Sequence, residues 1–321
     1  MKKTRVGVVR GGPSSEYEVS LSTGAAVLKN LPDHYEPIDI FIGRDGIWHV
    51  HGVRHSIPAA FRKVDVVFNA MHGEFGEDGQ VQELFDKFGV KYTGSKAFPS
   101  RLAMNKALTK EFVAKGGIKT PIARLISKGE YDAGTAGKLY RSFPQPSVIK
   151  PMALGSSVGV AIAQTVHELE SALENAFKRS DSVLIEEYIS GKEATCGVVE
   201  RFNNSDLHAL PPVEIVPKSS TGFFDYDAKY LGKSEEICPG RFSAEERTEI
   251  ERLAAEVHKI MGLRHYSRSD FIIHPRRGIY FLEVNTLPGL TEASLLPKAV
   301  AASGSSLGNF LDHIIKQALE G

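Results

Sequence analysis

Residues 268–285 read RSDFIIHPRRGIYFLEVN, two apolar strand-like runs on either side of a Pro-Arg-Arg-Gly turn. This pattern predicts an antiparallel hairpin. With the turn centred on the two arginines, Asp270 lies opposite Glu283 and Arg268 lies opposite Asn285. Because side chains alternate along a strand, all four should project from one face of the hairpin.

The other face of the hairpin pairs Phe271 with Leu282 and Ile273 with Tyr280, which gives it a core side. Two directly opposed carboxylates repel each other unless a cation lies between them. Oxygen atoms of Asp, Glu and Asn are suitable ligands for Mg²⁺ that bridges nucleotide phosphates. The alternative, taken from this segment alone, is a solvated face with a chance pair of acids.

A second informative segment is residues 148–159, VIKPMALGSSVG. A strand that ends in Lys150, followed by a Gly/Ser turn, offers backbone N–H groups, hydroxyls and a cation to phosphate oxygens. An ordinary β-hairpin loop is the alternative. The segment 11–16, GGPSSE, is a strand-to-helix turn of the kind at which α/β sheets bind ligands.

Composition is that of a globular protein of two or three domains: 321 residues, 42% hydrophobic and 24% charged. Lys plus Arg and Asp plus Glu both number 39, so no nucleic-acid surface is indicated. The sequence has no apolar run of the ~18 residues needed for a membrane span and no signal-peptide core. Cys196 and Cys238 have no zinc or disulfide context. We therefore expect a cytoplasmic protein that contacts neither nucleic acid nor membrane.

The N-terminal third has the pattern of a parallel α/β unit. Strands are predicted at Arg5–Val9, Glu36–Phe41 and Val64–Asn69, and a helix over residues 14–31 with Ser15 and Glu18 in capping-box spacing. A further helix has one apolar stripe at Val81, Leu84, Phe85 and Phe88.

The rest of the chain has the pattern of two α+β units. One opens with a helix that carries Met104, Leu108 and Phe112, continues with strands near residues 121–126, 147–150 and 158–163, and has a helix over 166–177. The other has strands from 183 to 217, a Gly/Ser/Asp-rich loop to 235, a helix around 250–260, the hairpin and a final helix around 307–315.

Four segments together resemble the D-alanine:D-alanine ligases of the ATP-grasp superfamily, in the same order along nearly the whole chain. They are residues 11–20 (GGPSSEYEVS), 72–79 (HGEFGEDG), 150–159 and 283–291 (EVNTLPGLT). The resemblance implies a mixed α/β and α+β fold with three domains: 1–97, a parallel α/β substrate domain; 98–182, a central ATP-grasp domain; and 183–321, a C-terminal ATP-grasp domain. It also implies ATP-dependent joining of two D-alanine molecules through an acyl phosphate, for peptidoglycan precursors.

The resemblance also implies the nucleotide and metal residues. Lys106, Lys150 and Ser157 would contact the phosphates, Glu193 the ribose, and two Mg²⁺ ions, for which Mn²⁺ can substitute, would bind Asp270, Glu283 and Asn285. The remaining residues expected around ATP are Glu186, Tyr188 and Ile189, as the adenine-binding strand, together with Phe223 and Leu282.

For the amino-acid substrates, the resemblance implies that Glu16 binds the first ammonium and His72 lies nearby. Arg268 and the Gly289 N–H would stabilise an oxyanion. Ser294 and Leu295 would receive the second carboxylate. Lys229 and Tyr230 belong to the long segment 217–235, a candidate lid, and Ser156, Tyr230 and Glu16 match the set that latches it.

Two alternatives to this function stay open. One is a ligase of the same family that takes D-lactate or D-serine as its second substrate, although Lys229 and Tyr230 resemble the dipeptide-forming members. The other is a catalytically silent ATP-binding module, against which the intact Arg268, Asp270, Glu283 and Asn285 set argues. A homodimer is the expected assembly.

Overall fold

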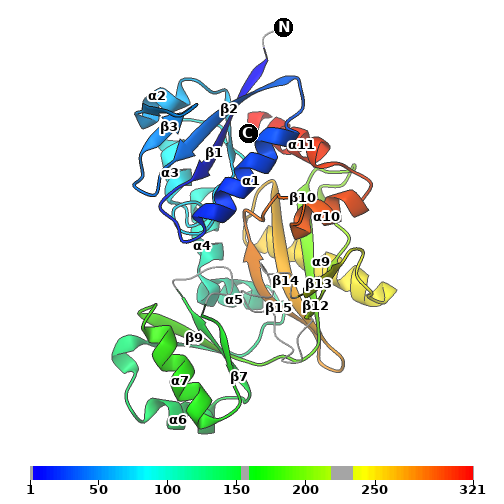
Figure 1. The fold of residues 1–321 in the computed structure, drawn as a ribbon. Helices are drawn as coiled ribbons and strands as arrows, with labels where there is room; N and C mark the ends of the chain where they lie inside the picture. Colours follow the sequence, from blue (N-terminus) through cyan, green and yellow to red (C-terminus); the bar gives the residue numbers. More distant parts are fainter. Residues whose placement is uncertain (1–2, 153–158, 218–233, 321) are drawn as a thin grey trace.

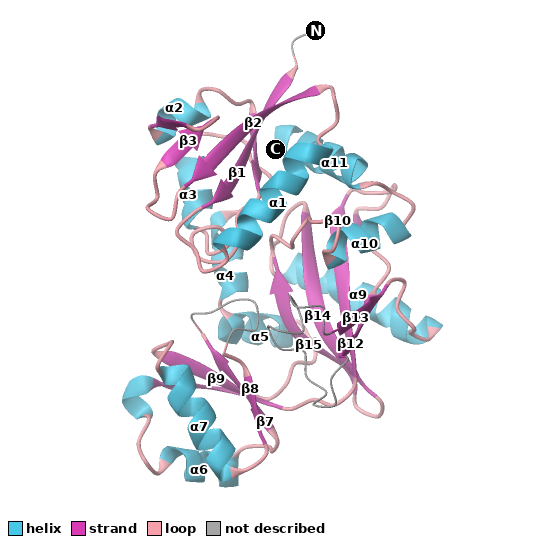
Figure 2. Ribbon diagram, viewed as in Figure 1, coloured by secondary structure: helices cyan, strands magenta, loops and turns pink. Residues whose placement is uncertain are grey.

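A computed structural model describes residues 3–152, 159–217 and 234–320. This part of the chain forms three sheets with flanking helices, in the mixed α/β and α+β arrangement that the sequence predicts (Figure 1). Each of the three regions combines strands with helices (Figure 2). Among the described residues, no helix has the length and apolar character to cross a membrane.

The first sheet is formed by β1 (Thr4–Gly11), β2 (Tyr35–Ile42), β3 (Trp48–Val50), β4 (Val53–His55) and β5 (Val66–Asn69), with α1 (Tyr17–Asn30), α2 (Ile57–Phe61) and α3 (Gln80–Lys87). Its strand order is β4-β3-β2-β1-β5. β1 pairs in parallel with β2 and with β5, as expected. The strands β3 and β4 add an antiparallel edge that the sequence pattern did not predict, because each has only three residues.

The two faces of the first sheet are covered by different parts of the chain. Val9 belongs to the core shared with α2 and α3. Val6 and Val8 face the other way, into a core that includes Phe310 and Ile314 of the C-terminal helix α11 (Leu307–Glu320). In Figure 1 the red α11 accordingly lies beside the blue α1. The two ends of the chain are therefore packed into one core.

The central sheet is formed by β6 (Ala123–Ser127), β7 (Ser147–Pro151), β8 (Ala161–Ala163) and β9 (Ser182–Glu187), with α6 (Thr135–Ser142), α7 (Val166–Phe177) and the 3₁₀ turn η1 (Lys128–Glu130). Its order is β6-β9-β7-β8, with antiparallel pairing. Ile149 and Ile185 pack in a core with α6 and α7. By alternation, Lys150 and Glu186 project from the opposite face. Since β9 completes this sheet, we propose that the second domain boundary lies after Glu187 rather than after residue 182.

The third sheet is formed by β10 (Lys192–Glu200), β11 (Leu207–Ala209), β12 (Val213–Pro217), β13 (Ser234–Ile237), β14 (Tyr266–His274) and β15 (Gly278–Asn285), with α4 (Ala97–Met104), α5 (Lys106–Lys115), α9 (Ala244–Ile260) and α10 (Leu295–Ala302). Its order is β13-β12-β10-β14-β15, and β11 pairs with β10. Cys196 and Phe271 pack in a core with α9. Thr195 and Asp270, which pair across β10 and β14, are left for the other face.

The hairpin of residues 268–285 has the predicted register at one end only. Asp270 lies opposite Glu283 and Arg268 opposite Asn285, as predicted. Past this point the prediction is wrong, because the register shifts and Phe271 pairs with Phe281 rather than with Leu282. The shift is a β-bulge, which inserts one extra residue into one strand. Leu282 is the extra residue, and nothing in the apolar pattern of the sequence marks it as a bulge.

Two helix predictions are also wrong. The predicted capping box at Ser15 is absent: α1 begins at Tyr17, and the Ser15 hydroxyl donates instead to Glu74, at 2.9 Å. The predicted helix through Met104, Leu108 and Phe112 is two helices, because the Asn105 side chain accepts a hydrogen bond from the Leu108 N–H and caps α5.

The packing of α11 on the first sheet predicts a stability cost for Phe310→Ala. The Phe310 ring is fully buried and meets Tyr266 edge-on, with 5.4 Å between ring centroids. Truncation of a buried Phe costs about 3–5 kcal/mol, since the cavity left behind relaxes only in part. Urea denaturation should show this loss. Asn309→Ala, on the exposed side of the same helix, is the control, and equal stability of the two variants would contradict the packing.

Candidate functional site

Two adjoining cavities, of about 310 and 120 Å³, lie where the three regions meet. Lys106, Arg268, Glu283 and Leu295 line both. The larger cavity also holds the predicted residues Glu16, His72, Asn285, Gly289 and Ser294. The smaller also holds the predicted residues Lys150, Glu186, Tyr188, Ile189, Glu193, Asp270 and Leu282. The structure thus brings together the predicted site residues that it describes, whereas Ser156, Ser157, Phe223, Lys229 and Tyr230 lie outside the described residues.

The acidic pair of the hairpin is held by its neighbours. Arg268 donates to both carboxylate oxygens of Asp270 at 3.0 Å, and the Thr195 hydroxyl donates to Asp270 Oδ1 at 2.6 Å. Asn285 Oδ1 accepts from the Leu287 N–H at 2.9 Å, which fixes its amide. The opposed acids therefore lie on strands in a defined orientation, rather than on a solvated face.

These donors fit a hard divalent cation. Asp270, Glu283 and Asn285 offer only oxygen atoms, which Mg²⁺ and Mn²⁺ prefer over nitrogen or sulfur. Asp270 and Glu283 are directly opposite each other, an arrangement that destabilises a sheet unless positive charge lies nearby. The hydrogen bonds to Asp270 leave lone pairs on its oxygens for a metal.

On the central sheet, Glu186 is a buried carboxylate between two ammonium groups. Its oxygens lie 2.8 Å from Lys150 Nζ and 3.1 Å from Lys110 Nζ. Burial raises the pKa of Glu186, but the two lysines outweigh it and the net pKa is lowered. Burial lowers the pKa of Lys150, but Glu186 and Glu283 together outweigh it and the net pKa is raised. Lys150 is therefore a permanent cation at the wall of the smaller cavity.

Tyr188 and Ile189, predicted to lie in a strand, follow the end of β9 instead. The Tyr188 N–H donates to the Pro146 carbonyl at 3.0 Å, which ties this segment to the start of β7. Ile189 is 3% exposed. Both still line the smaller cavity, so the prediction failed on the local conformation and not on the location.

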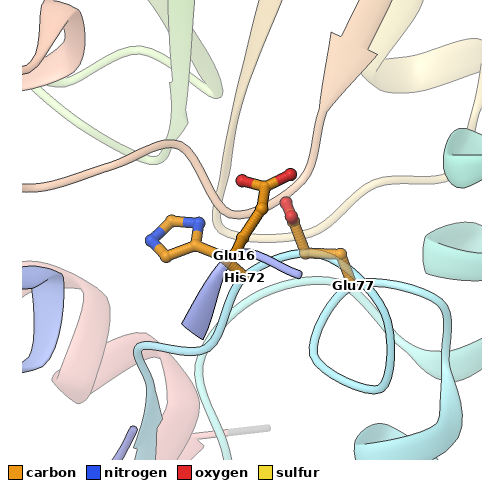
Figure 3. A group of neighbouring side chains, drawn as sticks. All are labelled: Glu16, His72 and Glu77. Atoms are coloured by element: carbon orange, nitrogen blue, oxygen red, sulfur yellow. The ribbon is translucent and has the colours of Figure 1, made fainter. Parts of the chain in front are cut away.

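Three titratable side chains from the first region meet in the larger cavity. Glu16, His72 and Glu77 lie close together (Figure 3), with the candidate ligand atoms within 4.8 Å of each other. The His72 ring is held by the Thr23 hydroxyl at 2.8 Å from Nε2. Burial, together with Arg268, lowers the pKa of His72 to about 4, so the imidazole is neutral at pH 7.

Glu77 is the member of this cluster to which the sequence assigned no role. Burial, and then the charge of Glu16, raise the pKa of Glu77 to about 8. Its Oε2 accepts the Gly73 N–H at 2.7 Å. A carboxyl group that is neutral at pH 7 beside Glu16 is poised to lose its proton when a cation enters the cavity.

Gly73, the first glycine of the 72–79 motif, is required for a steric reason. Gly73 has a φ of +67°, and a Cβ added there would lie 2.6 Å from the Ser14 hydroxyl oxygen. Any side chain would therefore clash with the turn that precedes α1, in a backbone conformation that other residues avoid. The hydroxyl of Ser14 donates to the His72 carbonyl at 2.7 Å and so holds the turn before α1 against the 72–79 segment. The two sequence motifs are thus packed on each other beside the cavity.

Besides Glu77, the sequence missed Lys110 and Thr195. The signal for Thr195 was its place opposite Asp270 on a neighbouring strand, but strand neighbours distant in sequence cannot be paired from one chain. The signal for Lys110 was weaker still, since a lysine in an amphipathic helix is normally exposed.

Comparison with known proteins identifies the family. A family model described as the D-ala D-ala ligase N-terminus matches residues 5–60 and 51–95, and one described as the D-ala D-ala ligase C-terminus matches residues 113–316. A D-alanine–D-alanine ligase from Geobacter sulfurreducens is 39% identical over 323 residues, which cover 99% of this chain and 95% of that protein.

Solved structures agree. The VanG D-Ala:D-Ser ligase from Enterococcus faecalis has a TM-score of 0.86 at 31% identity, covering 99% of this chain and 100% of that one. The D-alanine–D-alanine ligase from Bacillus anthracis complexed with ATP has a TM-score of 0.80 at 32% identity, covering 100% and 98%. The fold, the cavities and the length of the match lead to one conclusion: the chain belongs to the family of D-alanine–D-alanine ligases.

Proposed function

We propose that this protein joins two D-alanine molecules into D-alanyl-D-alanine at the expense of ATP, for peptidoglycan precursor synthesis. The observation that carries the proposal is the junction of the two cavities. Acidic groups suited to an ammonium, Glu16 and Glu77, open into the same space as Arg268, next to a cavity lined by Lys150 and Glu186. An amino-acid site and a nucleotide site therefore meet at Arg268.

The first step activates a carboxylate. An oxide ion is too poor a leaving group for an amine to displace it, so the first D-alanine must become an acyl phosphate, with ADP as the other product. Transfer of the phosphoryl group requires alignment and charge neutralisation rather than a protein nucleophile. Lys106 and Lys150 supply fixed positive charge at the cavity walls. Bound Mg²⁺ would add charge neutralisation, and Asp270, Glu283 and Asn285 are the residues that would hold it.

The second step joins the two molecules. The amine of the second D-alanine attacks the acyl carbon, and the carbonyl oxygen becomes an oxyanion before phosphate leaves. Arg268 and the Gly289 N–H, which line the same cavity, are the proposed donors to this oxygen. The attacking nitrogen must first lose a proton. Since acyl phosphates hydrolyse in water, we further propose that the segment between β12 and β13, which contains Lys229 and Tyr230 and lies outside the described residues, acts as the lid.

The carboxylate of the second substrate has a candidate site at the start of α10. Ser294 is the N-cap residue and Leu295 the first residue of this helix, and both line the larger cavity. The N–H groups of a helix N-terminus favour an anion. The same argument would hold for a D-serine carboxylate, and the similarity to the VanG D-Ala:D-Ser ligase keeps that acceptor as the second candidate.

Three finer statements stay predictions: two Mg²⁺ ions with Mn²⁺ as a substitute, a homodimer, and a cytoplasmic location. Metal titration of the ADP complex would count the ions. Light scattering of the purified protein would give the assembly.

A panel of acceptors tests the function itself. With Mg·ATP, we expect phosphate release to depend on D-alanine and to equal the dipeptide formed. D-serine and D-lactate in competition with D-alanine measure acceptor choice. Absence of D-alanine-dependent phosphate release would refute the ligase proposal, and a mixed D-alanyl-D-serine product in excess would favour the second candidate.

The proposed role of Arg268 predicts a selective loss. In Arg268→Met, acyl phosphate should still form, while condensation slows by about 10²–10³-fold because an oxyanion donor is missing. Hydroxylamine should therefore trap D-alanine hydroxamate. Arg276→Met, at the exposed turn of the same hairpin, should behave as the parent. If Arg268→Met traps no hydroxamate, Arg268 is needed before condensation and its assignment fails.

The pKa of Glu77 predicts proton release on substrate binding. The groups around its carboxyl are Glu16, His72, Arg268 and Tyr266. Below about pH 8 the entry of the D-alanine ammonium should displace the Glu77 proton. Calorimetry at pH 7 with an ATP analogue, in buffers of different ionisation enthalpy, would measure it.

Glu77→Gln is the comparison for that experiment. Without the titrating carboxyl, the release should disappear. Since the folded-state pKa lies above the unfolded value, the native protein binds more protons between about pH 4.5 and 8, and Glu77 makes it less stable as pH rises through this window. Glu77→Gln should remove that slope. Equal proton release in both proteins would contradict the assignment.

A further inference from the structure

Lys110 is a buried lysine that touches both sheets of the nucleotide cleft. Its side chain is 5% exposed. From α5, Nζ lies 3.1 Å from Glu186 Oε1 on β9 and donates to the Leu282 carbonyl on β15 at 3.2 Å. Lys110 does not line either cavity, whereas Glu186 and Leu282 line the smaller one. Lys110 therefore lies behind the wall of the smaller cavity and contacts two residues that form this wall, Glu186 and Leu282.

The β-bulge explains the contact with β15. Asp270 pairs with Glu283 and Phe271 with Phe281, so that Leu282 is the residue without a partner in the register. A bulge interrupts the ladder and re-aims the strand. The ammonium of Lys110 supplies a donor for the carbonyl at this interruption. The bulge immediately precedes Glu283, so a change in it would move a carboxylate of the proposed metal site.

On β9, the carboxylate of Glu186 is shared by two lysines. Lys150 and Lys110 flank the same carboxylate, at 2.8 and 3.1 Å, which gives this group of three a net charge of +1. Without Lys110, Glu186 and Lys150 would form a neutral pair. Lys150 would then have its positive charge committed to one neighbour, and less of it available to an anion in the cavity.

We propose that Lys110 is a positioning residue for the nucleotide: it joins β9 to the bulge of β15 and shares Glu186 with Lys150. This inference rests on the proposed function insofar as the nucleotide is ATP. Burial lowers the pKa of Lys110 despite Glu186, which is consistent with an ammonium that has given up water for these two partners. Its effect on ATP passes through Glu186, Lys150 and Leu282.

Direct nucleotide binding tests the proposal without relying on ligation. Lys110→Met should raise the Kd for Mg·ADP by about tenfold, the loss expected for a hydrogen bond to a charged group. The KM for ATP should rise more than the KM for D-alanine. Lys110→Arg, which keeps the charge and donors, should restore part of the affinity. Lys115→Met, on the exposed part of α5, is the matched control and should bind ADP as the parent does.

A double-mutant cycle separates positioning from general stability. In a Glu186→Gln background, Lys110→Met should have a smaller effect on the Kd, because the two residues act together. Equal effects in both backgrounds, or an unchanged Kd in Lys110→Met, would overturn the proposal. If Lys110→Met does not fold, Lys110→Gln keeps a donor for Leu282 and loses the charge, and a parental Kd there would overturn it. Binding of ADP by a protein that forms no dipeptide would refute only the ligase function.

Discussion

Two carboxylates, Asp270 and Glu283, face each other across neighbouring strands, and much of the surrounding structure offsets the repulsion between them. Arg268 takes both oxygens of Asp270. Lys150 lies on the opposite sheet, and the negative charges of Asp270 and Glu283 both raise the pKa of its ammonium group. Arg268 lies on the same strand as Asp270, whereas Lys150 comes from the opposite sheet, so only part of the neutralisation depends on the two sheets facing each other. The charge balance of Asp270 and Glu283 therefore depends in part on how the two sheets are arranged.

The same logic extends to the first region of the chain. Glu16 and Glu77 are close enough that one ionised carboxyl opposes ionisation of the other, and His72 is kept neutral by burial. The carboxylate of Glu16 and the guanidinium of Arg268 thus line the same cavity. A zwitterionic amino acid matches this change of sign over a short distance.

The sequence predicted the three-part fold, and each predicted site residue that is described lines one of the two cavities, because motifs such as 72–79 and 283–291 require specific side chains at fixed spacing. It also predicted the pairing of Asp270 with Glu283, although the turn is centred on Arg276 and the bulge at Leu282 is what restores the predicted register at this pair. It failed where a single residue changes the geometry. The bulge at Leu282 and the cap at Asn105 are such cases, since neither alters the apolar pattern around it. Lys110 and Thr195 were missed because their partners lie on strands that are distant in sequence.

The packing of α11 has a consequence for how the chain is made. The face of the first sheet that carries Val6 and Val8 is covered by Phe310 and Ile314, roughly three hundred residues later. During synthesis, that face is complete in sequence long before its cover leaves the ribosome. The early strands therefore leave part of this apolar face uncovered until α11 has been made and has packed onto it.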